Sequence, residues 1–306
     1  MSGSAWRLGW WAPVTPALAP HDLIDPIVHG PLLAALLDGA PLDGIGRSRL
    51  EGLVAAGLVL PGRAGAPPQP RFPVVPAAQV ADVLAESAKL GALIARLLAG
   101  EWSRLEVEYE PVRRLAPKLV PPAHSAGAPF SPGPAAAFLV VGGLLLDRGV
   151  RRQLRREGLI APPFGAAFTW LAEGDEGAAG IWFARSTPLP GRGTLIRFGR
   201  PGSAGWDAAA VDPEAAPALP AKGEPEISDL IEALGSPVAR LVTEAAPALE
   251  RACPSAAQAD PGAYLAWAYT LAADAALTAL VGRGLVDFPP GGAVAVRVAD
   301  PVLAAS

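Results

Sequence analysis

The stretch that decides the fold runs from Leu32 to Leu60 and reads LLAALLDGAPLDGIGRSRLEGLVAAGLVL. Its apolar beginning predicts a helix that stops at Asp38-Gly39, and a turn rich in Gly and Pro follows. A second short helix would carry Leu50 and Leu53 and end at Gly57, because glycine readily adopts the left-handed conformation that ends helices. Helix, turn, helix and a short apolar strand, in this order, predict a winged helix-turn-helix.

The helix end in this stretch recurs twice further along the chain. The spacing Leu-x-x-x-Gly-Leu-aliphatic occurs at residues 53–59, 154–160 and 280–286, each time followed closely by Pro or Gly and then by a β-prone run. Such internal similarity is typical of chains that repeat one supersecondary unit. The sequence therefore favours up to three winged-helix-like units, and chance recurrence of a common helix end is the alternative.

Composition limits the class of protein. The chain has 306 residues, of which 51% are hydrophobic, so it can build real cores and divide into two or three domains. Its formal net charge of -4 argues against a protein that coats nucleic acid. A single cysteine, Cys253, excludes an internal disulfide. No segment resembles a signal sequence or a membrane span, so we expect a cytoplasmic protein.

The fold class that we expect is α+β, with winged-helix-like units, small antiparallel sheets and a mainly helical C-terminal part. The expected domains are an N-terminal winged-helix-like domain with a long helix, a central α+β unit and a helical unit that ends in a short wing. Their expected bounds, with linkers at 116–134 and 206–225, are 1–115, 135–205 and 226–306. Expected strands are 6–10, 58–60, 72–75, 105–109, 168–171, 181–185, 194–198 and 293–298, and expected helices are 79–98, 148–157, 227–234, 237–251 and 264–281.

Arginines are concentrated in one predicted helix. Arg148, Arg151, Arg152, Arg155 and Arg156 fall at i, i+3, i+4, i+7 and i+8, so they would form one solvent-facing stripe. A winged helix inserts a helix in this position into the major groove of DNA. The same stripe could hold an acidic peptide through charge-assisted hydrogen bonds, or it could be a plain solvated face.

The central strands carry the aromatic candidates for a peptide site. These are Trp170, Trp182 and Phe183, with Ile181 beside them. An open sheet edge is a natural template for an added peptide strand. We expect a bound peptide to protect Ile181–Phe183 or Leu195–Arg197, in preference to the first wing at Leu58–Val75.

Catalytic and metal-binding motifs are missing from the sequence. His21 and His29 have Asp22 and Asp25 between them, yet no third ligand with metal-site spacing follows. No nucleophile elbow, phosphate-binding loop or zinc-protease motif occurs. We therefore expect no enzyme activity, no metal and no cofactor.

One family resemblance is carried by Leu36-Leu37-Asp38-Gly39 and by the run from Leu53 to Val59. These segments resemble the winged-helix recognition elements of ribosomal-peptide (RiPP) pathways, which are similar to the peptide chaperone of pyrroloquinoline quinone synthesis. In that family the leader peptide adds a strand to the wing edge and packs against the third helix, which implies Arg47, Arg49 and Leu58 as contacts here. The Gly/Pro-rich turn at residues 39–46 departs from the family pattern.

The whole chain also looks like the paired peptide-binding proteins of crocagin biosynthesis in size, composition and absent catalytic motifs. The sequence thus predicts a non-catalytic protein that holds a precursor peptide for a separate modifying enzyme, without a membrane and with nucleic acid disfavoured. A homodimer is left open. The alternatives are a winged-helix transcription regulator and an enzyme with no recognisable motif.

Overall fold

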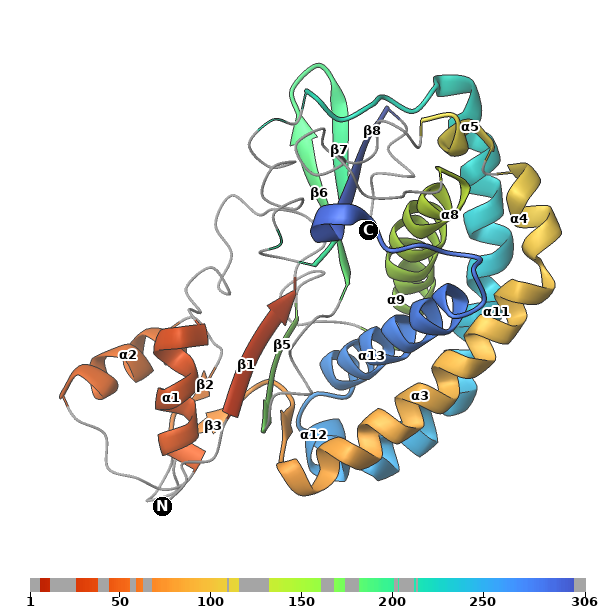
Figure 1. Ribbon diagram of the computed structural model, residues 1–306. Coiled ribbons are helices and arrows are strands. Elements are labelled where there is room, and N and C mark those ends of the chain that lie inside the picture. Colours follow the sequence, from red (N-terminus) through yellow and green to blue (C-terminus); the bar gives the residue numbers. More distant parts are fainter. Residues whose placement is uncertain are drawn as a thin grey trace.

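The computed structural model describes residues 6–11, 26–37, 44–55, 59–62, 68–108, 110–115, 132–160, 168–173, 182–200, 203, 212 and 214–299. The protein is α+β, as predicted, with small sheets and a mainly helical C-terminal part (Figure 1). A helical body lies on one side, a small unit built from the first two helices lies on the other, and two long strands run between them.

The N-terminal unit has the predicted order of helix, helix and hairpin. It consists of α1 (Pro26–Leu37), α2 (Gly44–Ala55), β2 (Val59–Leu60) and β3 (Gln69–Pro70). Its small core is made by side chains from each helix and from the hairpin, with Phe72 closing it; the buried members are Leu32, Leu33, Leu53, Val59 and Phe72. The apolar sides of α1, α2 and the hairpin face one another, so this unit has a core of its own that is separate from the main core.

The predicted wing is correct in its first strand and wrong in its second. Leu60 of β2 pairs with Gln69 of β3, whereas Val74–Val75, labelled β4, pairs in parallel with a distant strand. Phe72 belongs to the small core, and Val75 is fully buried in the main core. The chain crosses from one core to the other between these two residues, so residues 72–75 cannot return to β2.

Apart from the β2–β3 hairpin, the strands in the described part of the chain form two three-stranded sheets. β1 (Trp6–Trp11) pairs antiparallel with β5 (Phe168–Glu173), which lies between β1 and β4. β6 (Phe183–Leu189), β7 (Gly193–Gly199) and β8 (Ala293–Val298) form the second sheet in that order, antiparallel throughout. The expected C-terminal wing at 293–298 is therefore the third strand of this second sheet, called the central sheet below. Its residues Val294, Val296 and Val298 are buried in the main core.

Long helices cover the sheets. α3 (Ala77–Gly100) packs on α13 (Pro261–Val281) and on α11 (Glu224–Ala252), and α12 (Pro254–Ala259) connects the last two. The predicted helices at 79–98 and 264–281 are confirmed, with Val83, Leu90, Ile94 and Leu98 buried along one face. α13 is long and apolar enough to cross a membrane, but 67% of its apolar window is buried inside the protein, as in a core helix.

Two predicted elements are corrected. Residues 227–251 form one helix rather than two, since the buried face of α11 continues past Pro237 and its packing outweighs the lost backbone bond. The strand expected at 105–109 is wrong for residues 105–108, which belong to the helix α4 (Trp102–Glu108), and α5 (Glu110–Arg113) follows. Trp102 and Leu105 are buried three residues apart, and Val107 is 74% exposed, so the alternation of apolar residues there was misleading.

The apolar segment after residue 131 is one continuous helical run. α8 (Pro132–Ala137) leads into η2 (Phe138–Val150), a π-helix, and then into α9 (Arg151–Arg156). All 13 residues of η2 are buried. Its glycines permit close approach, because a Cβ at Gly142 would lie 2.3 Å from the ring of Phe198 on β7. The main core that results draws side chains from all three predicted units.

The recurring Leu-x-x-x-Gly-Leu spacing marks a helix end in both copies that the structure describes. Gly158 and Gly284 have φ of +73° and +68°. The amide of Leu159 donates to the carbonyl of Leu154 at 2.9 Å, and the amide of Leu285 donates to that of Leu280 at 3.1 Å. This six-residue return bond is the Schellman motif. Gly57, in the first copy, lies outside the described residues.

Candidate functional site

The first candidate site is the wing of the N-terminal unit. β2 and β3 bond only to each other in the described part of the chain, through the pairs Val59–Pro70 and Leu60–Gln69. Val59 is buried, whereas Leu60 is 48% exposed. The hairpin thus keeps a strand edge beside a small apolar core, which is the arrangement that strand addition requires. Leu58 lies outside the described residues.

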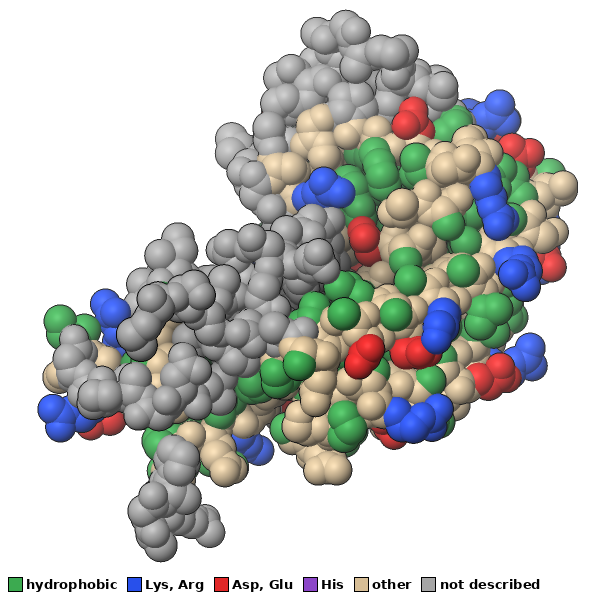
Figure 2. Space-filling view, turned by 60° about the horizontal axis from the view of Figure 1, so that its bottom comes forward, with side chains coloured by type: hydrophobic (Ala, Val, Ile, Leu, Met, Phe, Trp, Pro, Cys, Tyr) green, Lys and Arg blue, Asp and Glu red, His purple; other side chains and the backbone are tan. Residues whose placement is uncertain are grey.

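The predicted arginines of this unit are on α2. Arg47 and Arg49 are both exposed, as is Ile45 near the start of the helix. Figure 2 shows basic side chains, with an acidic one beside them, at the outer end of this unit, and basic and acidic side chains interspersed over the helical body on the same face. The structure therefore leaves Arg47 and Arg49 available to a ligand.

The central sheet offers a less open edge than expected. β7 is bonded to β6 on one side and to β8 on the other, so Leu195–Arg197 cannot accept an added strand, and that prediction is wrong. β8 is itself covered at Arg297, whose amide donates to Pro217 O and whose carbonyl accepts from the amide of Leu219, both at 2.8 Å.

The outer edge of β6 is also partly closed. The amide of Ala184 points away from β7 and donates to Asp147 Oδ2 at 2.6 Å. Alternate residues share this direction, which assigns Ser186 and Pro188 to the same edge. Ser186 is buried, and Pro188 has no amide hydrogen to donate. Phe183 stands at the start of β6 opposite Gly199, and Ile181 lies outside the described residues.

The arginine stripe does not lie on a single solvent-facing side, and this expectation is wrong for Arg148 and Arg151. Arg151 is only 1% exposed. Its Nε donates to Asp147 Oδ1 at 2.8 Å, its Nη1 donates to Ala266 O at 3.1 Å and its Nη2 donates to Thr270 Oγ1. Asp147, Arg148 and Arg151 lie on the side of the helical run that is buried in the protein.

Burial sets the ionisation of this cluster. It raises the pKa of Asp147, an effect that the charge of Arg151 and the amide of Ala184 oppose. Burial likewise lowers the pKa of Arg148 to about 10, with Arg152 and Arg155 adding repulsion. The Arg151 guanidinium also lies 5.3 Å from the centre of the Tyr269 ring. Asp147 and Arg151 are therefore part of the framework rather than a surface for a ligand.

The outer arginines differ from the inner ones. Arg152 and Arg156 both reach Glu232 on α11, at 3.3 Å and 2.9 Å. Arg155 is half-buried, with Nη2 buried and without a hydrogen-bond partner, and burial lowers its pKa. Of the predicted arginine contacts, Arg152 and Arg155 thus remain near the surface.

Trp182 is a core residue beneath an exposed arginine. It is 6% exposed, packs edge-on against Phe138 at 4.9 Å and stacks on Phe288 at 4.8 Å. The Arg200 guanidinium lies 4.5 Å from the centre of its ring. Because Phe138, Phe288 and Arg200 cover the indole ring, Trp182 presents little surface to a peptide side chain. Trp170 lies in the central strand β5, paired with Gly9.

Asp147, Arg200 and Asp274 were not among the residues predicted from the sequence. Asp274 on α13 has one carboxylate oxygen buried without a partner, and burial raises its pKa to about 6 although Arg200 opposes the shift. The available signal was an acidic residue inside an otherwise apolar helical run, for Asp147 as well as for Asp274. Among the residues that the structure describes, no three His, Cys, Asp or Glu side chains are grouped so that they could hold a metal ion.

Comparison of the chain with models of known protein families, with curated protein sequences and with solved structures finds no match.

Proposed function

We propose that this protein is a non-catalytic peptide-binding protein, which holds a ribosomal precursor peptide for a separate modifying enzyme in natural-product biosynthesis. The observation that carries the proposal is the β2–β3 wing, whose strands bond only to each other in the described part of the chain. The outer strands of the central sheet, by contrast, are covered at Ala184 and at Arg297. Recognition is therefore assigned to the wing rather than to the central strands.

Strand addition at the wing would give affinity through backbone bonds. Each such bond contributes about 0.5–1.5 kcal/mol net. Side-chain contacts must therefore supply the remainder of the binding free energy. Leu60 offers exposed apolar surface beside the strand, and Arg47 and Arg49 offer positive charge on α2. An extended peptide with an apolar anchor and acidic residues fits this surface, in keeping with the family resemblance of Leu32–Leu60.

The test is calorimetry with the synthetic precursor peptide encoded beside the gene. Arg47→Ala with Arg49→Ala should weaken binding by about tenfold, since electrostatic contacts at the rim are lost. The matched control is Arg96→Ala with Arg240→Ala, two exposed arginines on α3 and α11, which should leave the affinity unchanged. Hydrogen exchange should show protection at residues 59–60 and 69–70. Equal loss in both double variants would contradict the assignment.

A winged-helix DNA-binding regulator is the second candidate. The observation that favours it is α2 itself, because Arg47, Ser48 and Arg49 are exposed on the helix that follows the turn, the usual position of a DNA-reading helix. A gel-shift with genomic fragments separates the two functions. A discrete nanomolar site with a steep salt dependence would support DNA binding, whereas binding no tighter than roughly micromolar would support the peptide.

A further inference from the structure

Positive charge accumulates on the helical run formed by η2 and α9. The arginine stripe places five guanidinium groups there, and Figure 1 shows this run in the helical body, apart from α1 and α2. Two carboxylates among the described residues form ion pairs with them. Asp147 pairs with Arg151 at 2.8 Å, and Glu232 pairs with Arg152 at 3.3 Å and with Arg156 at 2.9 Å. Five cations against two anions leave a surplus of three positive charges.

The surplus is concentrated around Arg148 and Arg155. Arg148 is 3% exposed, and Arg155 is half-buried with its Nη2 turned away from solvent. Burial lowers the pKa of both arginines, and repulsion from Arg152 lowers it further, so the three guanidinium groups lie close enough to act on one another. Asp147 is the described carboxylate that opposes both shifts, and it is already bonded to Arg151. Buried positive charge in excess of nearby negative charge is costly, so this position favours an added anion.

Neighbouring contacts hold the arginines in place. Arg151 donates to two oxygens of α13, and Arg152 Nη2 donates to Glu232 of α11. A Cβ at Gly149 would lie 2.3 Å from the side chain of Ile231, so the run also packs closely on α11. The positive surface therefore exists before an anion binds, which lowers the entropic cost of binding.

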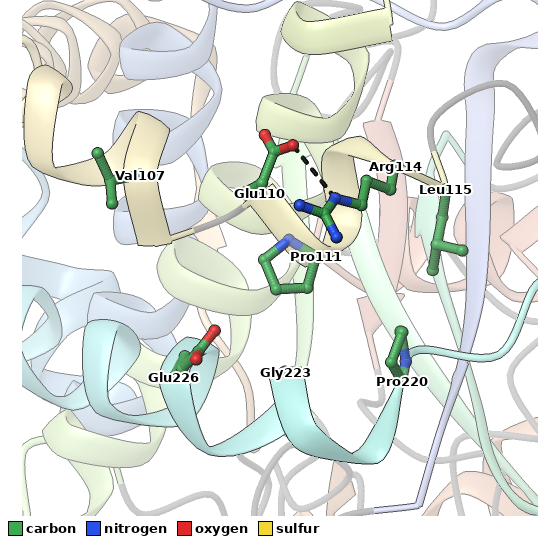
Figure 3. A pocket seen from close by; sticks show the side chains of 8 residues that line it. All are labelled: Val107, Glu110, Pro111, Arg114, Leu115, Pro220, Gly223 and Glu226. Carbon is green, nitrogen blue, oxygen red and sulfur yellow. Dashed lines mark hydrogen bonds and ion pairs between the residues drawn. The ribbon is translucent and has the colours of Figure 1, made fainter.

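The pocket between α5 and the start of α11 carries no such surplus. Its volume is about 300 Å³, and its walls include α5, the turn η3 (Ala221–Gly223) and the first turn of α11. Figure 3 shows the ion pair of Arg114 with Glu110, and Arg113 also lies 3.6 Å from Glu110. Together with Glu226 these side chains make two cations and two anions, so the pocket does not select a charged ligand.

We propose that Arg152 and Arg155, with Arg148 beneath them, bind a phosphate group. Guanidinium groups hold phosphate oxygens through paired, charge-assisted hydrogen bonds. Arg155 is partly exposed and forms no ion pair among the described residues, and the side chain of Arg152 is 16% exposed. Arg148 is buried, so it adds charge from the inner side. A dianion offsets the surplus better than a monoanion does, which favours phosphate over a carboxylate.

The experiment is calorimetric titration of the full chain with inorganic phosphate at about pH 8, where phosphate is mainly a dianion. We expect a dissociation constant of about 0.1–10 mM, the range of ligands of this size. Acetate, which offers one negative charge, should bind at least about fivefold more weakly. Glycerol 3-phosphate forms a second arm. Tighter binding of glycerol 3-phosphate identifies a phosphate monoester as the source of the group, and equal or weaker binding identifies free phosphate.

The variants locate the site independently of the proposed wing. Arg155→Gln should weaken phosphate binding at least about fivefold, because one of the two accessible guanidinium groups is lost. Arg240→Gln makes the same change of charge at an exposed position on α11 and should leave phosphate binding unchanged. Circular dichroism shows whether each variant is folded. Undetectable binding to the folded protein at about 50 mM phosphate, equal affinity for acetate, or an unchanged affinity in Arg155→Gln would each overturn the proposal.

Discussion

At the scale of single residues, the protein depends on charges that it buries. Taking a carboxylate and a guanidinium out of water costs several kcal/mol for each ion. Asp147 and Arg151 offset this cost with hydrogen bonds from three directions, to Ala184, Ala266 and Thr270. These partners come from β6 and α13, so the pair fixes how the π-helix sits between a sheet and a long helix.

Loss of one member should therefore be costly. Arg151→Met leaves Asp147 buried without its cation and should lower the free energy of unfolding by about 3–5 kcal/mol. Arg156→Met is the matched control, since the Arg156–Glu232 pair is more than half exposed and such pairs contribute about 0–1 kcal/mol. Urea denaturation measures both. A loss below about 1 kcal/mol in Arg151→Met would show that the pair is not needed for stability.

Asp274 should make stability depend on pH. Its pKa rises from the ordinary 3.8 to about 6 in the folded protein, so the folded state binds this proton more tightly than the unfolded chain does. Stability from this group is therefore present below pH 3.8 and decreases as pH rises to about 6. Asp274→Asn should remove the decrease and raise stability at pH 7 by roughly 1–2 kcal/mol after solvent screening.

Urea midpoints at pH 4, 5, 6 and 7 check this prediction. Asp82→Asn, at an exposed position on α3, is the control and should shift the midpoint little at any pH. Parallel curves for the wild type and Asp274→Asn over this range would show that the Asp274 carboxyl is not destabilising when ionised. In that case water would satisfy its buried oxygen.

At the scale of elements, local sequence patterns predicted where helices and strands lie better than they predicted which elements pack or pair with one another. The spacing of Val83, Leu90 and Ile94 suffices to identify α3, because one helical face must be buried. The alternation in residues 105–109 failed because α4 continues from α3 and buries Trp102 and Leu105 at helical spacing. The pairing of β8 with β7 was not predictable, since it joins segments almost a hundred residues apart and strand alternation does not specify a partner.

The contact between α3 and α13 depends on one glycine. A Cβ at Gly91 would lie 2.6 Å from Ala272 O and 2.7 Å from the Cβ of Ala275, so the two helices would have to separate. Gly91→Ala should lower the free energy of unfolding by about 1–3 kcal/mol, the usual cost of overpacking. Gly100→Ala on the same helix has no neighbour within 4 Å and should stabilise by up to about 1 kcal/mol.

The opposite signs of these two effects distinguish steric crowding from helix propensity, which is the same in both variants. Thermal unfolding followed at 222 nm measures both changes. A gain in stability for Gly91→Ala would mean that the helices can separate without cost.

At the scale of the whole molecule, the candidate site was only partly readable from sequence. Arg47 and Arg49 are exposed on α2, so a ligand could reach them, and their contact with a peptide stays a prediction. The arginine stripe was misread, because helical spacing shows which residues share a face but not whether that face meets solvent. Arg151 can be buried because its guanidinium donates hydrogen bonds to Asp147, Ala266 and Thr270. Ala266 and Thr270 are more than a hundred residues away in the sequence.

Because the two cores are separate, we expect the N-terminal unit to unfold in one step and the main body in another. The core of the N-terminal unit holds Leu53 and Phe72, while the main core holds Leu277, and the adjacent residues Val74 and Val75 belong to different cores. Leu53→Ala should cost about 2–4 kcal/mol within the small unit and speed hydrogen exchange in α1, α2 and β2 alone. Leu277→Ala, at a similarly buried position, should speed exchange in α3, α11 and α13 as well. If Leu53→Ala accelerates exchange equally in α3 and α13, the two cores unfold together, and the wing cannot open or close independently when a peptide binds.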